Sequence, residues 1–173
     1  MKHDNSYELR FSGLKVGVHT FDWRIDAGFL HERGVDWISK ADLSVTLEVE
    51  KKERLMDLMF HIEGDLISAC DRCGEDTTIS LDLDDLLVVK FAHETDLTDD
   101  EVVFIDDQEH HIEVSQFIYE FIMVGLPGRI VHPEGECDPE VEKYLEEAEE
   151  EGTEDEQNND IDPRWEALKK LKQ

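Results

Sequence analysis

The most constraining feature of this sequence is a pair of cysteines, Cys70 and Cys73, which are separated by two residues and followed directly by Gly74. Both sulfurs of such a pair can point at one metal ion, and the glycine lets the backbone turn tightly. Cys137 is the third and last cysteine, and His132, five residues before it, is the most plausible fourth donor. The spacing therefore predicts a closed, structural zinc site of three thiolates and one imidazole.

Other interpretations of the same residues stay open. A Cys-x-x-Cys pair can be two unrelated thiols, or a redox pair, which normally opens a helix in a βαβ unit. The strand-like runs on either side of residues 70–73 favour the tip of a hairpin instead. A cytosolic metal or redox sensor would need an exposed thiol of low pKa. His110 and His111 compete with His132 for the fourth position, because the chain has 8 histidines.

Alternating apolar and polar residues predict β-strands in the first half of the chain. The clearest alternations are in residues 20–25, 42–49, 56–62 and 79–83. We expect Gly64-Asp65 to break the third strand, and we expect the apolar run 86–91 to form a separate buried strand. The fold class predicted is α+β: an antiparallel β-sheet body with a Cys-x-x-Cys zinc-knuckle hairpin, one or two packed helices and an acidic C-terminal tail.

Two helices are expected after these strands. Ser115 can cap the first one. The apolar face of that helix, which we expect to cover one face of the sheet, consists of Phe117, Ile118, Phe121 and Ile122. Asp138-Pro139 places an aspartate at the cap and a proline at the first position of the second helix. From residue 149 to residue 160 the composition is acidic and of low complexity, which predicts a disordered linker.

The expected domain organisation has three parts. Residues 1–133 form the sheet-rich domain, 134–160 the acidic helix and disordered linker, and 161–173 a C-terminal docking helix. A tryptophan on a short helix beyond a linker is expected to dock, either on its own protein or on a partner. The candidate partner-binding residues are Trp165, Arg164 and Leu168.

The formal net charge of −28 bears on the choice of partner. Residues 134–160 hold 14 acidic residues and one lysine, so the rest of the chain still carries −15. Such a surface repels a phosphate backbone and attracts basic proteins, although it could also serve solubility alone. A cluster of basic side chains in three dimensions would instead favour RNA. The candidates for that cluster are Arg10, Arg24, Arg54, Lys51 and Lys52.

The sequence contains no recognisable catalytic motif. It has no Gly-rich phosphate loop, no nucleophile elbow and no His-Glu-x-x-His pair, so we expect neither an enzyme nor a small-molecule substrate. No apolar run approaches the roughly 18–20 residues needed to cross a membrane, and the N-terminus is polar. Three cysteines without a signal peptide predict a cytoplasmic protein with reduced thiols.

Taken together, these motifs resemble the YceD family, the large ribosomal RNA accumulation proteins. The resemblance spans nearly the whole chain. It rests on Cys70-Asp71-Arg72-Cys73, on the apolar helix that ends in Leu126-Pro127, on the late Cys137, and on the ending Asp162-Pro163-Arg164-Trp165; Phe11-Ser12-Gly13-Leu14 is a weaker match.

The resemblance implies a bacterial cytoplasmic protein that is needed for normal levels of large-subunit ribosomal RNA, with no enzymatic activity. It also implies a gene that commonly neighbours one for a large-subunit ribosomal protein. Many family members carry extra cysteines after the Leu-Pro element, whereas this chain has only His132 and Cys137 there. We therefore expect a non-enzymatic ribosome-biogenesis factor that binds a basic large-subunit ribosomal protein or a pre-ribosomal particle. The alternatives are a direct precursor-rRNA binding protein and a metal or redox sensor.

Overall fold

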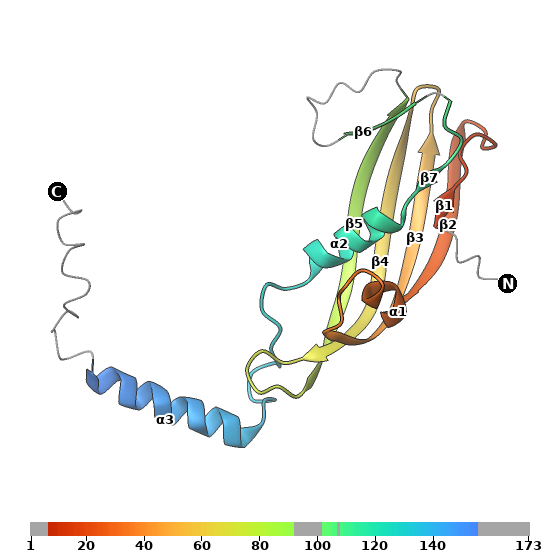
Figure 1. Ribbon diagram of the computed structural model, residues 1–173. Coiled ribbons are helices and arrows are strands. Elements are labelled where there is room, and N and C mark those ends of the chain that lie inside the picture. Colours follow the sequence, from red (N-terminus) through yellow and green to blue (C-terminus); the bar gives the residue numbers. More distant parts are fainter. Residues whose placement is uncertain (1–6, 92–101, 107, 156–173) are drawn as a thin grey trace, which may run out of the picture. The chain divides into compact units, whose positions relative to one another are not determined.

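The strands and two of the helices belong to one part of the chain. The computed structural model describes residues 7–91, 102–106 and 108–155 (Figure 1). The chain divides into two units, Met1–Val131 and His132–Gln173. The first unit contains all the strands together with helices α1 and α2, and the second contains helix α3.

A five-stranded sheet in the order β2-β3-β4-β5-β6 forms the body of the first unit. Its strands are β2 (Gly17–Asp26), β3 (Ile38–Lys51), β4 (Leu55–Ala69), β5 (Asp76–Phe91) and β6 (Val102–Ile105). Strands β2 to β5 are antiparallel neighbours, as predicted. β6 pairs with β5 in parallel, so the prediction of an antiparallel sheet was wrong at this edge. A period of two residues fixes which face a side chain occupies, but it carries no information on strand direction.

Strand β4 runs straight through Gly64, where the sequence predicted a break. Gly64 pairs with Leu43 on β3 and with Leu81 on β5. Its φ angle is +136°, and a Cβ atom at this position would overlap the carbonyl oxygen of Asp42. The glycine is therefore needed for close approach of the β3 backbone, and does not end the strand.

Strand β5 also continues further than predicted. Its 16 residues include the apolar run 86–91, which was expected to be a separate buried strand. Val89 is fully buried, but Leu86 is 54% exposed. The run places apolar side chains on both faces of one strand, and only one of these faces is covered by the core.

Two helices lie on one face of the sheet (Figure 1). Helix α1 (Ala27–His31) begins at Asp26, whose carboxylate accepts a hydrogen bond from the Phe29 amide. Helix α2 (Ser115–Gly125) follows the small antiparallel pair formed by β1 (Glu8–Leu9) and β7 (Ile112–Glu113).

The predicted apolar face of α2 is confirmed. Ile118 and Ile122 are fully buried, and the ring of Phe121 lies 5.1 Å from that of Phe60 on β4. The predicted cap was wrong: Ser115 is the first helical residue, and the preceding cap residue makes no side-chain hydrogen bond. The Ser115 amide instead donates a hydrogen bond to a carboxylate oxygen of Glu113 at 3.2 Å, so an acidic side chain supplies the acceptor.

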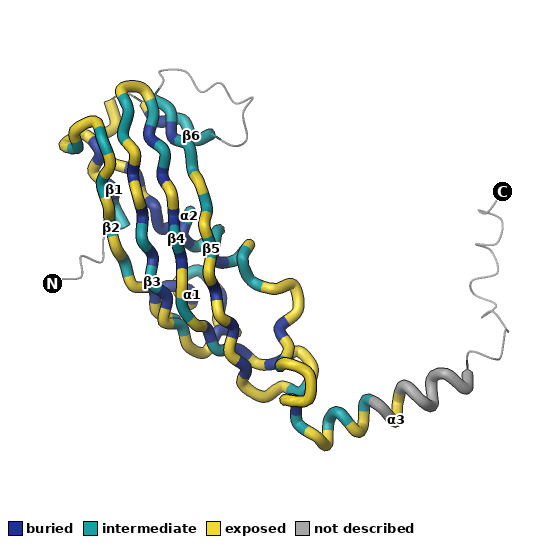
Figure 2. The backbone as a smooth tube through the Cα atoms, turned by 180° about the vertical axis from the view of Figure 1, so that it is seen from behind, coloured by how far each residue is buried: buried dark blue, intermediate teal, exposed yellow. Residues whose placement is uncertain are grey.

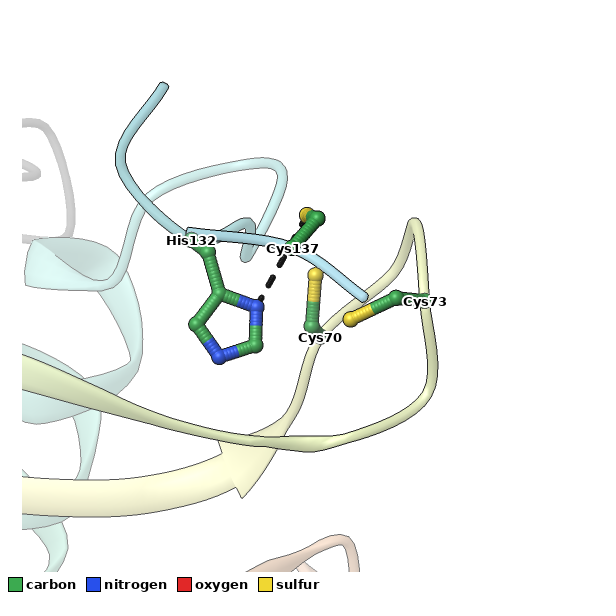
Figure 3. A group of neighbouring side chains, drawn as sticks. All are labelled: Cys70, Cys73, His132 and Cys137. Atoms are coloured by element: carbon green, nitrogen blue, oxygen red, sulfur yellow. Dashed lines mark hydrogen bonds between the residues drawn. The ribbon is translucent and has the colours of Figure 1, made fainter. Parts of the chain in front are cut away.

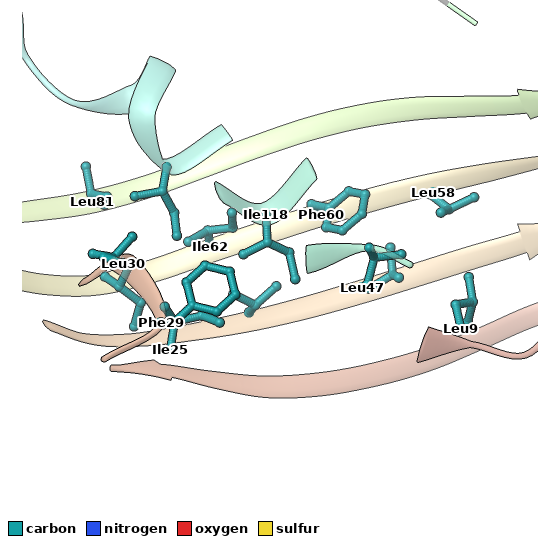
Figure 4. Packing of buried hydrophobic residues seen from close by; sticks show 14 of the residues in the cluster. Leu9, Ile25, Phe29, Leu30, Leu47, Leu58, Phe60, Ile62, Leu81 and Ile118 are labelled. Carbon is teal, nitrogen blue, oxygen red and sulfur yellow. The ribbon is translucent and has the colours of Figure 1, made fainter. Parts of the chain in front are cut away.

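The hydrophobic core fills the space between α1, α2 and the inner face of the sheet (Figure 4). It draws on every second residue of the long strands. Figure 4 labels Leu9, Ile25, Phe29, Leu30, Leu47, Leu58, Phe60, Ile62, Leu81 and Ile118. Figure 2 shows the sheet from behind, where exposed positions alternate with buried ones along each strand.

Helix α3 (Pro139–Asp155) begins as predicted. The carboxylate of Asp138 accepts a hydrogen bond from the Glu140 amide at 2.8 Å. The helix continues to Asp155, so residues 149–155 are helical where a linker was predicted. Glutamate is a good helix former, which explains why a segment with little to bury can still be helical.

The predictions for residues 156–173 fall outside the described residues. They include the end of the linker, the C-terminal docking helix and the candidate partner residues Trp165, Arg164 and Leu168. Within the described part of the chain, no helix is both long enough and apolar enough to cross a membrane.

Gly64→Ala tests the close approach of β3 and β4. We expect the free energy of unfolding to fall by about 1–3 kcal/mol, because the new Cβ meets backbone atoms and the φ angle is unfavourable for alanine. Gly13→Ala is the matched control, because nothing lies within 4 Å of a Cβ there and its φ angle is not positive. Denaturant unfolding measures both variants, and equal stabilities would contradict this account of Gly64.

Candidate metal centre

The first half of the candidate centre is the tip of the β4–β5 hairpin, as predicted. The last pair of the ladder joins Ala69 to Asp76, and residues 70–75 form the turn. The Cys70 amide donates to the Glu75 carbonyl at 2.8 Å, and the Gly74 amide donates to the Cys70 carbonyl at 2.9 Å. Gly74 has a φ of +81°, which glycine adopts without strain. The glycine after the second cysteine therefore closes the turn.

The turn also directs a backbone donor at a sulfur. The Arg72 amide lies 3.4 Å from Cys70 Sγ. Hydrogen bonds of this kind favour the negatively charged form of a ligand. Cys70 is buried, with 3% of its surface exposed, and Cys73 is half-buried. The tip therefore presents two sulfurs that are shielded from bulk water.

A second turn carries His132 and Cys137. The Glu136 amide donates to the Pro133 carbonyl at 3.1 Å, and Gly135 has a φ of +81°. Across this turn Cys137 Sγ lies 3.8 Å from His132 Nδ1. Cys137 is buried, with 5% of its surface exposed. The five-residue spacing noted in the sequence thus brings one sulfur and one ring nitrogen together.

All four predicted ligands gather in one cluster (Figure 3). One donor atom from each of Cys70, Cys73, His132 and Cys137 lies within 4.8 Å of the other three. Around a tetrahedral ion with bonds of about 2.0–2.3 Å, neighbouring donors are about 3.5–3.8 Å apart, so only small movements would close the site. The competing His111 lies elsewhere, with its Nε2 3.4 Å from a carboxylate oxygen of Glu8.

The chemistry of these donors fits a metal. Three sulfurs and one imidazole nitrogen are a donor set found in structural zinc sites, and four protein ligands leave no open position for a substrate. None of the three cysteines forms a disulfide. The Cys-x-x-Cys pair joins two strands and does not open a helix, unlike the usual redox pair. The arrangement is suited to holding chain segments together.

Sequence reasoning missed the role of Asp71. Its amide donates to the Ile130 carbonyl at 2.7 Å, and its carboxylate accepts from the Ile130 amide at 2.7 Å. These two hydrogen bonds fix the hairpin tip to the segment that leads into His132. An aspartate inside a Cys-x-x-Cys motif is a weak signal, because its partner lies 59 residues away in the sequence.

Comparisons with known proteins found a matching family model and a curated relative. The family model described as "Large ribosomal RNA subunit accumulation protein YceD" matches residues 58–172, a range that includes all four clustered residues. A curated relative is the "Uncharacterized protein YlbN" of Bacillus subtilis (strain 168), which is 26% identical over 157 residues. That alignment covers 87% of this chain and 86% of the relative. No solved structure matches the chain.

Asp71→Ala tests the side-chain hydrogen bond at the hairpin tip, because alanine keeps the backbone amide that donates to the Ile130 carbonyl. We expect metal affinity to fall by about ten- to a hundredfold, because a hydrogen bond to a charged group contributes about 1.5–3 kcal/mol. Asp36→Ala, at an exposed position outside the hairpin, is the control. Competition with a chromophoric chelator gives both affinities. Identical values for the two variants would show that the Asp71 carboxylate does not position the ligands.

Proposed function

The chain belongs to the YceD family of large ribosomal RNA subunit accumulation proteins, and from this membership we propose that it is a non-enzymatic ribosome-biogenesis factor. Its partner in this proposal is a basic large-subunit ribosomal protein, or an assembly particle that contains one. The observation that carries the choice of partner is the net charge of −28. Proteins that bind RNA present cationic surfaces, and an acidic protein attracts them before they reach the RNA.

Zinc is the ion proposed for the four-residue centre. Thiolate ligands select soft or borderline ions, and zinc takes three cysteines and one histidine in tetrahedral, structural sites. Calcium and magnesium prefer oxygen ligands. With zinc bound, residues Cys70 and Cys73 would be tied to His132 and Cys137, so the ion would hold the hairpin tip and the following turn in a fixed geometry.

The described basic side chains give little support to direct binding of precursor RNA. Four of the five cations that could have formed an RNA-binding cluster are engaged within the protein. Arg10 pairs with Glu8, Arg24 with Asp42 and Lys52 with Glu50 and Asp57, while Lys51 donates to the carbonyls of Phe11 and Leu14. Their charges are therefore matched by carboxylates or used to hold a loop, and RNA would need counterion release from unmatched cations.

The burial of the sulfurs argues against a sensor. A sensor thiol has to be accessible to its oxidant or to an incoming ion. Cys70 and Cys137 are 3% and 5% exposed. Buried sulfurs are better suited to holding a structural ion than to sensing an oxidant or an incoming ion.

Zinc content and its removal test the proposed ion. Protein purified without oxygen should contain about one zinc per chain. Structural zinc in peptides contributes roughly 10–16 kcal/mol, which is comparable to the whole stability of a domain. We therefore expect Cys70→Ser and His132→Ala to lose zinc or bind it weakly, with a lower melting temperature, whereas His110→Ala should behave as the native protein. Absence of zinc from the native protein, or equal loss in the His110 variant, would refute this site.

Isolation of the tagged, full-length protein from cells tests the proposed partner. We expect basic large-subunit ribosomal proteins among the retained proteins, and association should slow as salt rises, because screening acts beyond about 8 Å at physiological ionic strength. Mass spectrometry and binding kinetics provide the measurements. Tight binding to protein-free precursor RNA at physiological salt, without affinity for basic ribosomal proteins, would refute the assignment.

A further inference from the structure

Only one face of the β2–β5 sheet is covered by the first unit. The side chains that point to the core belong to the same set of alternating positions as Leu43, Val45 and Leu47. The alternate positions face the other way, toward the side seen in Figure 2, and the described part of the first unit places no helix over them. We call this surface of β2, β3, β4 and β5 the open face.

Apolar side chains are exposed on the open face. Met59 on β4 is 41% exposed and Leu86 on β5 is 54% exposed, and the two are direct cross-strand partners. Val88, two residues from Leu86, is half-buried on the same face. The cross-strand row of Val88 ends on β2 at Val18, which is 59% exposed. A contiguous exposed apolar patch rimmed by polar side chains is a mark of interaction surfaces, and Met59 and Leu86 are adjacent across the strands.

Carboxylates surround these apolar side chains. The strand registers place eleven of them on the open face, and the described strand residues of the same face supply four basic side chains, Arg24, Lys40, His61 and Lys90. The eleven are Asp22, Asp26, Asp42, Glu48, Glu50, Asp57, Glu63, Asp65, Asp76, Asp82 and Asp84. Two of the four pair with carboxylates of the face: Arg24 with Asp42 at 3.1 Å, and His61 Nδ1 with Asp84 at 2.9 Å. The carboxylates therefore outnumber the basic side chains of the face by eleven to four.

One row contains three carboxylates side by side. Asp26, Asp42 and Asp65 are direct cross-strand partners on β2, β3 and β4. Each carboxylate has a partner within the chain: Asp26 caps α1, Asp42 pairs with Arg24, and Asp65 accepts a hydrogen bond from Ser80. Only Arg24 among these partners is charged, so the row keeps a net negative charge, and like charges directly opposite each other repel. The same three residues line an open hollow of about 630 Å³ together with Lys40, Ile67 and other residues. A cationic side chain from another molecule would relieve the repulsion and has room to enter.

The pKa of His61 indicates that the open face favours positive charge. Its pKa is raised above the ordinary value, chiefly by the hydrogen bond with Asp84 and further by the charges of Asp84, Glu63 and Asp82, while desolvation acts in the opposite direction. The neighbours therefore favour the protonated ring, as they would favour any other cation placed on the face.

We infer that the open face is the docking surface for a lysine- or arginine-rich segment of a partner protein, with apolar side chains that cover Met59 and Leu86. This inference rests on the proposed function, because it locates the surface that receives the basic partner. The charges on the face repel the phosphates of nucleic acids and of anionic membranes. A second copy of this chain would bring another net charge of −28 to the same surface. A basic, partly apolar peptide segment matches both features.

Methionine methyl signals provide a direct test in the full-length protein. The probe is a peptide of alternating lysine and valine with 10 residues, the length of β2. We expect it to shift the methyl signal of Met59 and to leave that of Met56, which is fully buried on the opposite face of the same strand, unchanged. A peptide of the same length with glutamate in place of lysine should not bind. A shift of Met56 without one of Met59 would overturn the inference.

Charge reversal on the face supplies the matched variants. Glu48→Lys/Asp82→Lys should weaken peptide binding by about fivefold or more, because two attractions become repulsions. Glu32→Lys/Glu109→Lys makes the same change of charge at exposed sites away from the open face, and should leave affinity nearly unchanged. Equal weakening in both pairs would show that only total charge matters and would overturn the inference.

Two further outcomes separate this inference from the proposed function. If the native protein and Glu48→Lys/Asp82→Lys both retain large-subunit ribosomal proteins from cells, the surface is wrong and the proposed function stands. If the native protein retains none, the proposed function itself fails. A Met59 signal that moves in Lys169→Glu/Lys170→Glu protein without any peptide would show that the C-terminal segment of the chain occupies the face, and would overturn assignment to a partner.

Discussion

The continuous register of the β4–β5 hairpin is the constraint on which the rest of the first unit depends. Fifteen residues of β4 pair with β5 without a break, from Leu55 opposite Lys90 to Ala69 opposite Asp76. A slip of one residue would exchange the two faces of a strand. It would bring carboxylates into the core and expose the residues that pack against α1 and α2. The core and the open face are therefore fixed by the same pairing.

The hairpin also sets the position of the metal ligands. Its tip brings Cys70 and Cys73 to one point, and Asp71 fixes that point to Ile130 through two hydrogen bonds. Gly64 matters for the same reason, because it lets β3 approach closely without a bulge in the β4–β5 pairing. A single long element thus supports a buried core, an acidic surface and the candidate metal centre. Its two faces and its tip can serve different purposes because their side chains do not compete for the same space.

Sequence patterns predicted most of these local features. Alternation identified the long strands, the apolar stripe identified α2, and cysteine spacing with His132 identified the clustered donors. Two errors were local, the Ser115 cap and the linker predicted over residues 149–155. The other errors depend on contacts between segments remote in sequence. The role of Gly64 depends on the backbone of Asp42, and the direction of β6 depends on its partner strand. The role of Asp71 depends on its contact with Ile130. Exposure of Leu86 likewise depends on which face the helices cover. Local patterns determine periodicity, whereas strand partners and covered faces are determined by the assembled fold.

The central claim is that three cysteines and one histidine close a zinc site at the hairpin tip, and X-ray absorption at the zinc edge tests it most directly. The account predicts three sulfur neighbours at about 2.3 Å and one nitrogen neighbour at about 2.0–2.1 Å in the native protein. It also predicts that zinc still bound to the His132→Ala protein keeps three sulfur neighbours but lacks the signal of the imidazole nitrogen. A native spectrum with two sulfurs and two light atoms, or with coordination unchanged in the His132 variant, would contradict the claim.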